Sequence, residues 1–389
     1  RSRRRAIQST KEPYDSMKRI RFPFPPGSRS PFTLLIGFTA LTGLILLVAL
    51  PVSCVSSHRA GYLTASVAGI GTAILATRPQ AAQPQLIQPL GIRPAHLRTD
   101  PVNAVPNQQA FTQALWAPGI DHGYVPQGLT FAQGQILMSG YRSRSPADSM
   151  GPCRVYRLDP ESGEVTGYFD LPPACGHAGG LAYAGGGVLI LSDTRRLYRL
   201  DLDLALKEKH ADKAITGTLE LAGALRGSFA AFVPAIAWPG SGAPDRTGTL
   251  PETTPGMFIG AWSLSARTAR GYFLPLSLFD SHGGATITEA DAVSSIPLAA
   301  RAQGAAVAPN GSFWLSYSSH DFGRIQQVDP ASGQILASYP QVSGIEDISF
   351  DELGGLWAVS EAGSLRWRSW RTSFPVVFRL DTELLESAY

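Results

Sequence analysis

From about Phe111 onward, apolar and polar residues alternate in short runs that are bounded by Gly, Pro, Asp or Asn. Alternation with a period of two is typical of half-buried β-strands. The preceding stretch, residues 78–109, is instead rich in Pro, Gln and Ala and predicts an extended linker. The hydrophobic pattern therefore places an all-β domain in the C-terminal part of the chain.

One of these runs recurs as a hexapeptide. RVYRLD, RLYRLD, RIQQVD and VVFRLD occupy residues 154–159, 196–201, 324–329 and 376–381, and two copies continue into the turns DPESG and DPASG. Repeats of roughly 40–50 residues, each with several short strands, are the signature of a β-propeller with four-stranded blades. The sequence therefore predicts a propeller over residues 111–389, with the hexapeptide as the third strand of each blade.

The repeats divide into five units. They cover residues 128–171, 180–221, 228–293, 304–340 and 347–381. The third unit carries an insertion at 234–256, and its fourth strand is predicted at 285–293. The fifth unit lacks a fourth strand, which residues 111–117 would supply to close the ring and remove exposed sheet edges. Five blades are favoured, and six are the alternative if residues 265–300 form a separate blade.

The strand register predicts which side chains meet at the mouth of the central channel. The innermost strands begin there, and the second strands, running antiparallel, end there. The ligand-binding residues expected on this basis are Gln127, Tyr141, Asp193, Ser228, Trp262, Gln303 and Tyr317. A concave site with aromatic walls and a few convergent polar groups is typical of ligand binding.

Several of these residues have a structural alternative. Gln127 and Gln303 would also lock neighbouring blades through backbone hydrogen bonds, and Asp193 would also start a turn. The hexapeptide arginines are expected in salt bridges at blade edges rather than in anion binding: Arg154, Arg196 and Arg324.

Glu346 and Glu361 are the strongest candidates for chemistry. They lie at adjacent strand ends of one blade, and two neighbouring carboxylates need a cation, a shared proton or a donor to balance them. Ca²⁺ or Mg²⁺ held by Glu346 and Glu361, with Gln303 and backbone carbonyls, is one solution. Acid–base catalysis by these two residues with His177 is the other, and His177 capping a connection between blades is its structural alternative.

The charge of the chain is uneven. Residues 1–30 contain nine Lys or Arg against Glu12 and Asp15, although the whole chain carries only +3, so the propeller is mildly acidic. No basic face with interleaved aromatic residues is evident, and nucleic acid is not an expected partner. The basic segment precedes an uncharged apolar run at 32–52, long enough to cross a bilayer.

This pattern predicts a basic cytoplasmic tail at 1–31, a transmembrane helix or signal anchor at 32–53 and a membrane-proximal segment with linker at 54–110. The propeller would then lie on the periplasmic or extracellular side. Residues 61–77 form a second, weaker apolar stretch, which is either a further span, a linker or the site of signal cleavage that would release a secreted protein. Cys153 and Cys175 either pair in an oxidising compartment or stay as thiols.

Several motifs carry a resemblance to known propellers. GSFWLS (311–316) and GGLWAVSE (354–361) are similar to repeats of virginiamycin B lyase-type propellers, within the broad NHL and gluconolactonase class. The ordered set PQGL, HAGGLA, IGAW, QGAAVA, GIEDISF and SEAGS resembles a group of uncharacterised secreted bacterial β-propellers. The resemblance implies the fold, and it implies no activity. That group usually has an acidic residue where this chain has Ala261.

Two functions follow as hypotheses. The first is a membrane-anchored, exported propeller that binds a small ligand or a protein partner at its channel mouth, for instance as a subunit of an envelope complex. The second is a Ca²⁺- or Mg²⁺-assisted hydrolase or lyase acting on a lactone, ester, glycoside or phosphoanhydride, with Glu346, Glu361 and His177 as its catalytic residues.

Overall fold

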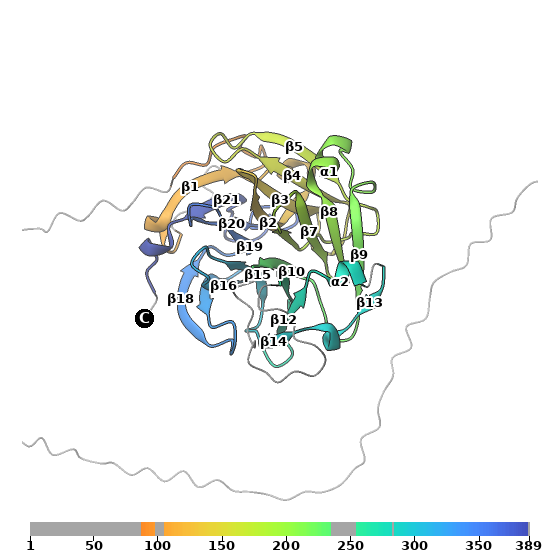
Figure 1. Cartoon of the computed structure of the whole chain (residues 1–389). Helices are drawn as coiled ribbons and strands as arrows, with labels where there is room; N and C mark the ends of the chain where they lie inside the picture. The colour runs from red at the N-terminus through yellow and green to blue at the C-terminus, as the bar shows by residue number, and fades with distance from the viewer. Residues whose placement is uncertain (1–86, 98–104, 235–253, 282–283, 388–389) are drawn as a thin grey trace, which may run out of the picture. The chain divides into compact units, whose positions relative to one another are not determined.

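The computed structural model describes residues 87–97, 105–234, 254–281 and 284–387. Five antiparallel sheets of four strands each are arranged around a common axis, and one of them gains a short fifth strand (Figure 1). The five innermost strands contact one another in a ring: β2, β6, β10, β15 and β19. The chain is a five-bladed β-propeller. The five-blade prediction is confirmed, and residues 265–300 do not form a sixth blade.

The first two blades follow the predicted units. Their strands are β2 (Tyr124–Ala132), β3 (Gln135–Arg142), β4 (Cys153–Leu158), β5 (Val165–Asp170), β6 (Gly180–Tyr183), β7 (Val188–Asp193), β8 (Arg196–Asp201) and β9 (Ile215–Leu221). A helix that the hydrophobic pattern does not reveal, α1 (Leu202–Glu208), follows β8 and begins where Asp201 accepts a hydrogen bond from the backbone N–H of Leu204 at 2.9 Å.

The last two blades also follow the predicted units. Their strands are β15 (Ala302–Val307), β16 (Phe313–Ser318), β17 (Gly323–Val328), β18 (Ile335–Gln341), β19 (Ile345–Phe350), β20 (Leu356–Ser360) and β21 (Val376–Leu380), with β1 (Phe111–Trp116) as the fourth strand of blade five. β1 pairs antiparallel with β21, so the N-terminal strand closes the ring as predicted.

The third blade departs from the prediction at its outer edge. Its strands are β10 (Phe229–Val233), β11 (Gly256–Gly260), β12 (Arg270–Pro275) and β14 (Ser294–Pro297), with α2 (Leu278–Ser281) after β12. The prediction of a strand at 285–293 is wrong, because Thr288 and Asp291 cap each other in a 3₁₀ turn (Glu289–Asp291) that interrupts it. The residues before that turn, β13 (Thr286–Ile287), pair with β9 of blade two instead. The insertion predicted at 234–256 lies largely outside the described residues.

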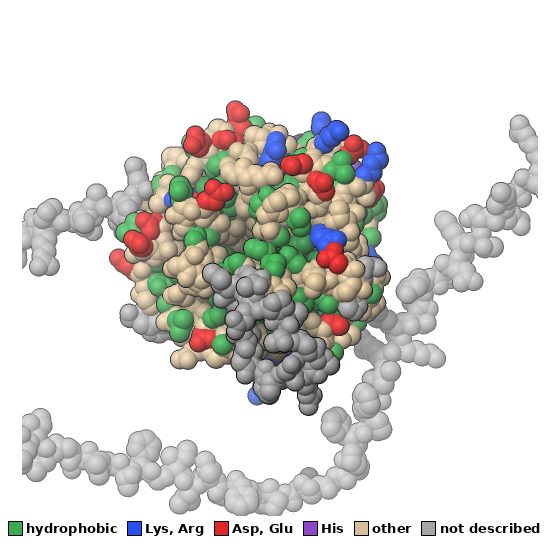
Figure 2. Space-filling model, in the orientation of Figure 1, with side chains coloured by type: hydrophobic (Ala, Val, Ile, Leu, Met, Phe, Trp, Pro, Cys, Tyr) green, Lys and Arg blue, Asp and Glu red, His purple; other side chains and the backbone are tan. Residues whose placement is uncertain are grey.

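The hydrophobic core consists of five clusters, and each lies between two neighbouring blades. Every blade therefore buries both faces of its sheet, which explains the long apolar runs in strands such as β11. On the face drawn in Figure 2, Lys and Arg side chains are interspersed with Asp and Glu rather than gathered into one basic area.

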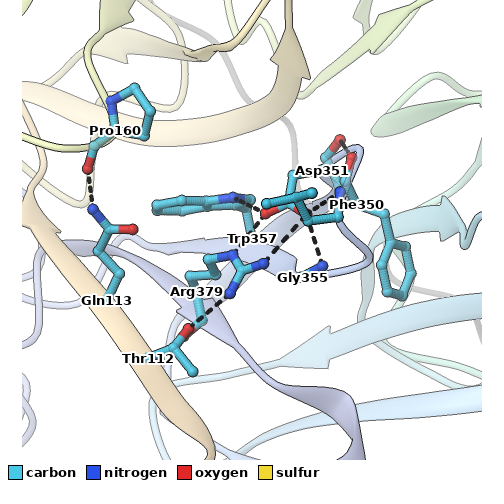
Figure 3. A network of polar contacts seen from close by, with 10 residues as sticks. Thr112, Gln113, Pro160, Phe350, Asp351, Gly355, Trp357 and Arg379 are labelled. Carbon is cyan, nitrogen blue, oxygen red and sulfur yellow. Dashed lines mark hydrogen bonds and ion pairs between the residues drawn. The ribbon is translucent and has the colours of Figure 1, made fainter.

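A polar network fastens the closing strand to blade five (Figure 3). Arg379 of β21 donates to Asp351 at 2.6 Å and to Thr112 of β1 at 3.2 Å. Asp351 is almost fully buried and also accepts the indole N–H of Trp357 at 3.0 Å. Gln113 of β1 donates to the carbonyl of Pro160 in blade one. The last hexapeptide thus supplies the arginine that locks the ring.

Asp347 closes the channel below the mouth. Its carboxylate is fully buried and accepts backbone N–H groups of Leu129 and Leu181, each at 3.1 Å, from the innermost strands of blades one and two. Gly304 of blade four lies so close that a Cβ there would be 2.6 Å from Asp347. The mouth is therefore a pocket with a floor rather than the opening of a continuous tunnel.

Candidate functional site

A cavity of about 600 Å³ lies at the channel mouth, where the innermost strands begin. Its volume is within the usual range of small-molecule sites. Eight of the predicted site residues line it: Gln127, Tyr141, His177, Ser228, Trp262, Gln303, Glu346 and Glu361.

Glu346 and Glu361 form the floor of this cavity. Glu346 lies at the start of β19 and Glu361 directly follows β20, and the pairing of Ile345 with Ser360 brings them together. They are 3% and 8% exposed, and their carboxyl groups are hydrogen-bonded to each other. The amide of Gln303 donates to Glu346 Oε1 at 2.8 Å. The two carboxyls therefore act as one unit.

Burial and the closeness of the two carboxyl groups favour retention of a proton by this pair. Burial raises the pKa of Glu361 to about 7. Burial also raises the pKa of Glu346 well above its ordinary value, and the negative charge of Glu361 adds to the effect. Two adjacent buried carboxyls cannot both ionise cheaply, so sharing one proton is the favoured state. The pair then offers a bound ligand both a donor and an acceptor.

The segment after β20 supplies site residues that the strand register did not predict. The indole N–H of Trp367 donates to Glu361 Oε2 at 2.5 Å, and the Trp367 ring stacks on Trp370 with centroids 4.8 Å apart. Arg366 packs against the Trp367 ring at 4.5 Å and donates to Ser143 Oγ at 3.3 Å. The sequence LRWRSW at 365–370, with aromatic and cationic residues outside any strand pattern, was the available signal.

His177 and Tyr141 form one wall. Their rings stack with centroids 4.5 Å apart, and His177 Nδ1 lies 3.3 Å from the carbonyl of Ser149. Burial lowers the pKa of His177, so the imidazole is neutral at pH 7. Gln127 donates to the carbonyl of Pro126 on its own strand at 2.7 Å and to the Glu361 side chain of blade five at 3.4 Å, so its side chain bonds no backbone of a neighbouring blade.

Asp193 and Tyr317 do not line the cavity. The Asp193 carboxylate accepts the backbone N–H groups of Gly176, His177 and Ala178 at 3.1, 2.7 and 3.1 Å, a structural role different from the start of a turn that was considered for it. It holds the turn that presents His177. Tyr317 is 2% exposed in the core between blades three and four, and burial raises its pKa to about 12.

The hexapeptide arginines lie at blade edges. Arg154 pairs with Asp170 at 2.6 Å, and Arg196 pairs with Glu220, in each case with the residue directly opposite on the fourth strand. Arg324 differs because the residue opposite is Pro340, and its guanidinium lies 4.9 Å from the ring of Tyr317. None of the three is part of the cavity lining.

The donor set at the floor does not fit a resident Ca²⁺ or Mg²⁺ in this arrangement. The carboxyl oxygens receive amide and indole N–H groups from Gln127, Gln303 and Trp367, and the pair retains a proton. Within the described ranges, no three His, Cys, Asp or Glu side chains converge as a ligand set. A cation would require both amides to turn and the pair to ionise.

The membrane span predicted at 32–53 lies outside the described residues. In the part of the chain that the structure does describe, no helix has the length and apolar character needed to cross a membrane.

No known family model matches this sequence, and no curated protein matches it. Among solved structures, the chain is similar to Myxococcus xanthus glutaminyl cyclase, with 14% identity and a TM-score of 0.44 over 72% of this chain and 97% of that chain. It is also similar to the Dos1 propeller (14%, TM-score 0.32, 60% and 53% covered) and to BamB from Moraxella catarrhalis (10%, TM-score 0.30, 66% and 58% covered). None of these similarities bears on its activity.

Proposed function

We propose that this protein is an exported, membrane-anchored propeller that binds a small polar ligand in the cavity at its channel mouth. The observation that carries the proposal is the floor of the cavity, where the buried carboxyl groups of Glu346 and Glu361 lie together beneath aromatic walls. Burying two carboxyls costs stability, and buried carboxyls with raised pKa values are typical of functional sites. They face the cavity at the mouth, and Asp347 ties the innermost strands together below them.

Ligand retention tests this proposal. The purified protein and a Trp262→Ala variant are equilibrated with a small-molecule extract of the host, and retained compounds are compared by mass spectrometry. Trp262 lines the cavity and is 45% exposed, so its loss should spare the fold while reducing retention. Leu353→Ala, which alters a 90% exposed residue in the β19–β20 turn, is the matched control. Identical profiles for the protein and the Trp262→Ala variant would contradict the proposal.

Export is tested with alkaline phosphatase, which is active only outside the cytoplasm. Fusions after residue 60 and after residue 85 should both be active if residues 32–52 form the single span. An inactive fusion after residue 85 would place the propeller in the cytoplasm and show that residues 61–77 form a second span.

A hydrolase or lyase is the second candidate. It is favoured by the same proton-sharing pair together with neutral His177 on the cavity wall, since carboxyls with separated protonation states serve as acid and base. If a retained compound is converted to product by the wild-type protein and not by a Glu361→Gln variant, catalysis is established. Titration with Ca²⁺ and Mg²⁺ during the same assay tests whether either cation takes part.

A further inference from the structure

Two arginines flank an exposed tryptophan on the rim of the cavity. Arg226 lies two residues before Ser228, whose Oγ accepts the backbone N–H of Trp262 at 3.0 Å. The carbonyl of Ser263 in turn accepts the backbone N–H of Arg301 at 2.8 Å. These hydrogen bonds set the order Arg226, Trp262, Arg301 along the rim, and all three side chains line the cavity.

Neither arginine is neutralised by an acidic side chain. Among the residues that the structure describes, no carboxylate lies within 4.0 Å of either guanidinium. Toward the described residues, Arg226 donates to the carbonyls of Gly223 and Leu225, at 2.9 and 2.6 Å, and burial together with nearby Arg195 lowers its pKa. Arg301 lies 5.7 Å from the ring of Phe322. Half-buried cations that have no acidic partner among the described residues favour an anionic ligand.

We propose that the ligand is an anionic saccharide, whose ring stacks on Trp262 while its carboxylate or phosphate group is bound by Arg226 and Arg301. This deepens the proposed function and rests on it. Both anions suit the planar donor fork of a guanidinium.

The floor favours a sugar over an aromatic acid. Hydroxyl groups both donate and accept hydrogen bonds, which matches the proton-sharing pair of Glu346 and Glu361 and the neutral imidazole of His177. An aromatic acid of the same size would bury these groups against an apolar ring without compensation. The ring of Trp262, 45% exposed at the rim, presents the flat apolar surface on which the C–H face of a sugar packs.

Calorimetry on the full chain in detergent tests this inference with five probes: digalacturonate, glucose 6-phosphate, neutral cellobiose, benzoate and inorganic phosphate. We expect one of the two anionic saccharides to bind more tightly than the other four probes. Arg226→Gln and Arg301→Gln should each weaken that binding at least tenfold, or about 1.4 kcal/mol. Arg267→Gln is the matched control, because Arg267 is exposed on the loop that carries Trp262 and does not line the cavity. Arg267→Gln should change the affinity by no more than about twofold, because salt screens the charge of an exposed side chain.

Several results would overturn the inference. If cellobiose binds as tightly as the anionic saccharides, the arginines do not select an anionic ligand. If benzoate or inorganic phosphate binds more tightly than either anionic saccharide, the ligand is not a saccharide. Failure of every saccharide to bind, in a protein that still retains a Trp262-dependent compound, would overturn the inference and leave the proposed function intact. Identical retention of compounds by the wild-type protein and Trp262→Ala would instead contradict the proposed function itself.

Discussion

The aspartate that ends the hexapeptide forms the following turn in two of the blades. Asp159 and Asp329 accept backbone N–H groups two and three residues ahead, at 2.7–3.0 Å, and thereby form the turns that follow β4 and β17. Gly163 and Gly333 complete these turns at φ angles of +72° and +74°, which side chains disfavour. Asp201 caps a helix instead. The motif is a strand terminator rather than a binding element.

Glu361→Gln should change how stability depends on pH. Both floor carboxyls have folded-state pKa values above the ordinary 4.5, so the folded chain binds a proton that the unfolded chain releases. The resulting stabilisation is complete below about pH 4.5 and is lost as the pH rises through about 7. The glutamine amide replaces the shared proton, so the free energy of unfolding should fall less steeply in this window, by up to about 1.4 kcal/mol per pH unit.

Urea unfolding at several pH values between about 5 and 7 measures this slope. Glu352→Gln is the control, because Glu352 is exposed and remote from the floor. Parallel profiles for the wild-type protein and Glu361→Gln would show that the pair does not retain its proton.

At the scale of elements, the union of β1 with β21 depends on the buried pair of Arg379 and Asp351. Arg379→Met would leave the Asp351 carboxylate, whose side chain is 7% exposed, without its cation. Burial alone would raise the pKa of Asp351, but hydrogen bonds led by Arg379 hold it below the ordinary value. We expect a loss of about 3 kcal/mol in the free energy of unfolding at neutral pH.

Chemical denaturation measures this loss, and it should shrink as the pH falls below about 3.8, where Asp351 is protonated in the unfolded chain and then in the folded one. Arg142→Met is the control, since Arg142 is exposed and, among the described residues, its side chain donates to the carbonyl of His122 and pairs with no carboxylate. An unchanged stability for Arg379→Met would show that backbone pairing of β1 suffices.

The turn that carries His177 lies beside β4, where Cys175 next to the turn contacts Cys153 of β4. Cys153 and Cys175 are each 1% exposed, and their thiols are hydrogen-bonded. This contact and burial raise the pKa of Cys153, so oxidation should be slow. Molecular oxygen would accept two electrons and two protons from the thiols as the disulfide forms, and would be reduced to hydrogen peroxide.

We therefore expect maleimide-reactive thiols in the unfolded protein to fall from three to one after prolonged oxidation, with Cys54 remaining. Mass spectrometry of the labelled chain gives this count. A Cys153→Ser variant should keep two reactive thiols under the same treatment. Three reactive thiols in the oxidised wild-type protein would show that the pair does not form a disulfide.

At the scale of the whole molecule, the ring is closed by its first strand. A chain that begins at residue 87 retains β1, including the stacking of Phe111 on Phe378 at 4.9 Å, whereas a chain that begins at residue 117 exposes the edge of β21. We expect one cooperative thermal transition for the longer chain. The shorter chain should melt at least about 10 °C lower and aggregate, since it loses buried apolar area and gains an open edge.

Calorimetry with light scattering distinguishes these outcomes. A chain that begins at residue 105 serves as the control, because it removes the backbone pairing of Leu90 with β1 and keeps β1 itself. Equal melting of the chains that begin at residues 87 and 117 would show that β1 is dispensable.

Most of the fold was predictable because a propeller repeats one local pattern. The hexapeptide set the strand register, and that register placed eight of the predicted residues on one cavity. The fourth strand of blade three escaped prediction because the mutual capping of Thr288 and Asp291 competes with strand pairing. Asp193 was predicted at the cavity because it lies at a strand end. Its carboxylate instead accepts backbone N–H groups of a turn, and a position at a strand end does not distinguish such a side chain from one that faces the cavity.

The sequence by itself determined the five repeated sheets, the closing strand and the ends of the strands that face the mouth. These follow from alternation and turn chemistry, which act over a few residues. Only the tertiary structure decided that the carboxyls of Glu346 and Glu361 are buried side by side, that Asp347 closes the channel, and that Arg226 and Arg301 flank Trp262. Burial and charge pairing depend on distances between blades, and sequence spacing carries no measure of those distances.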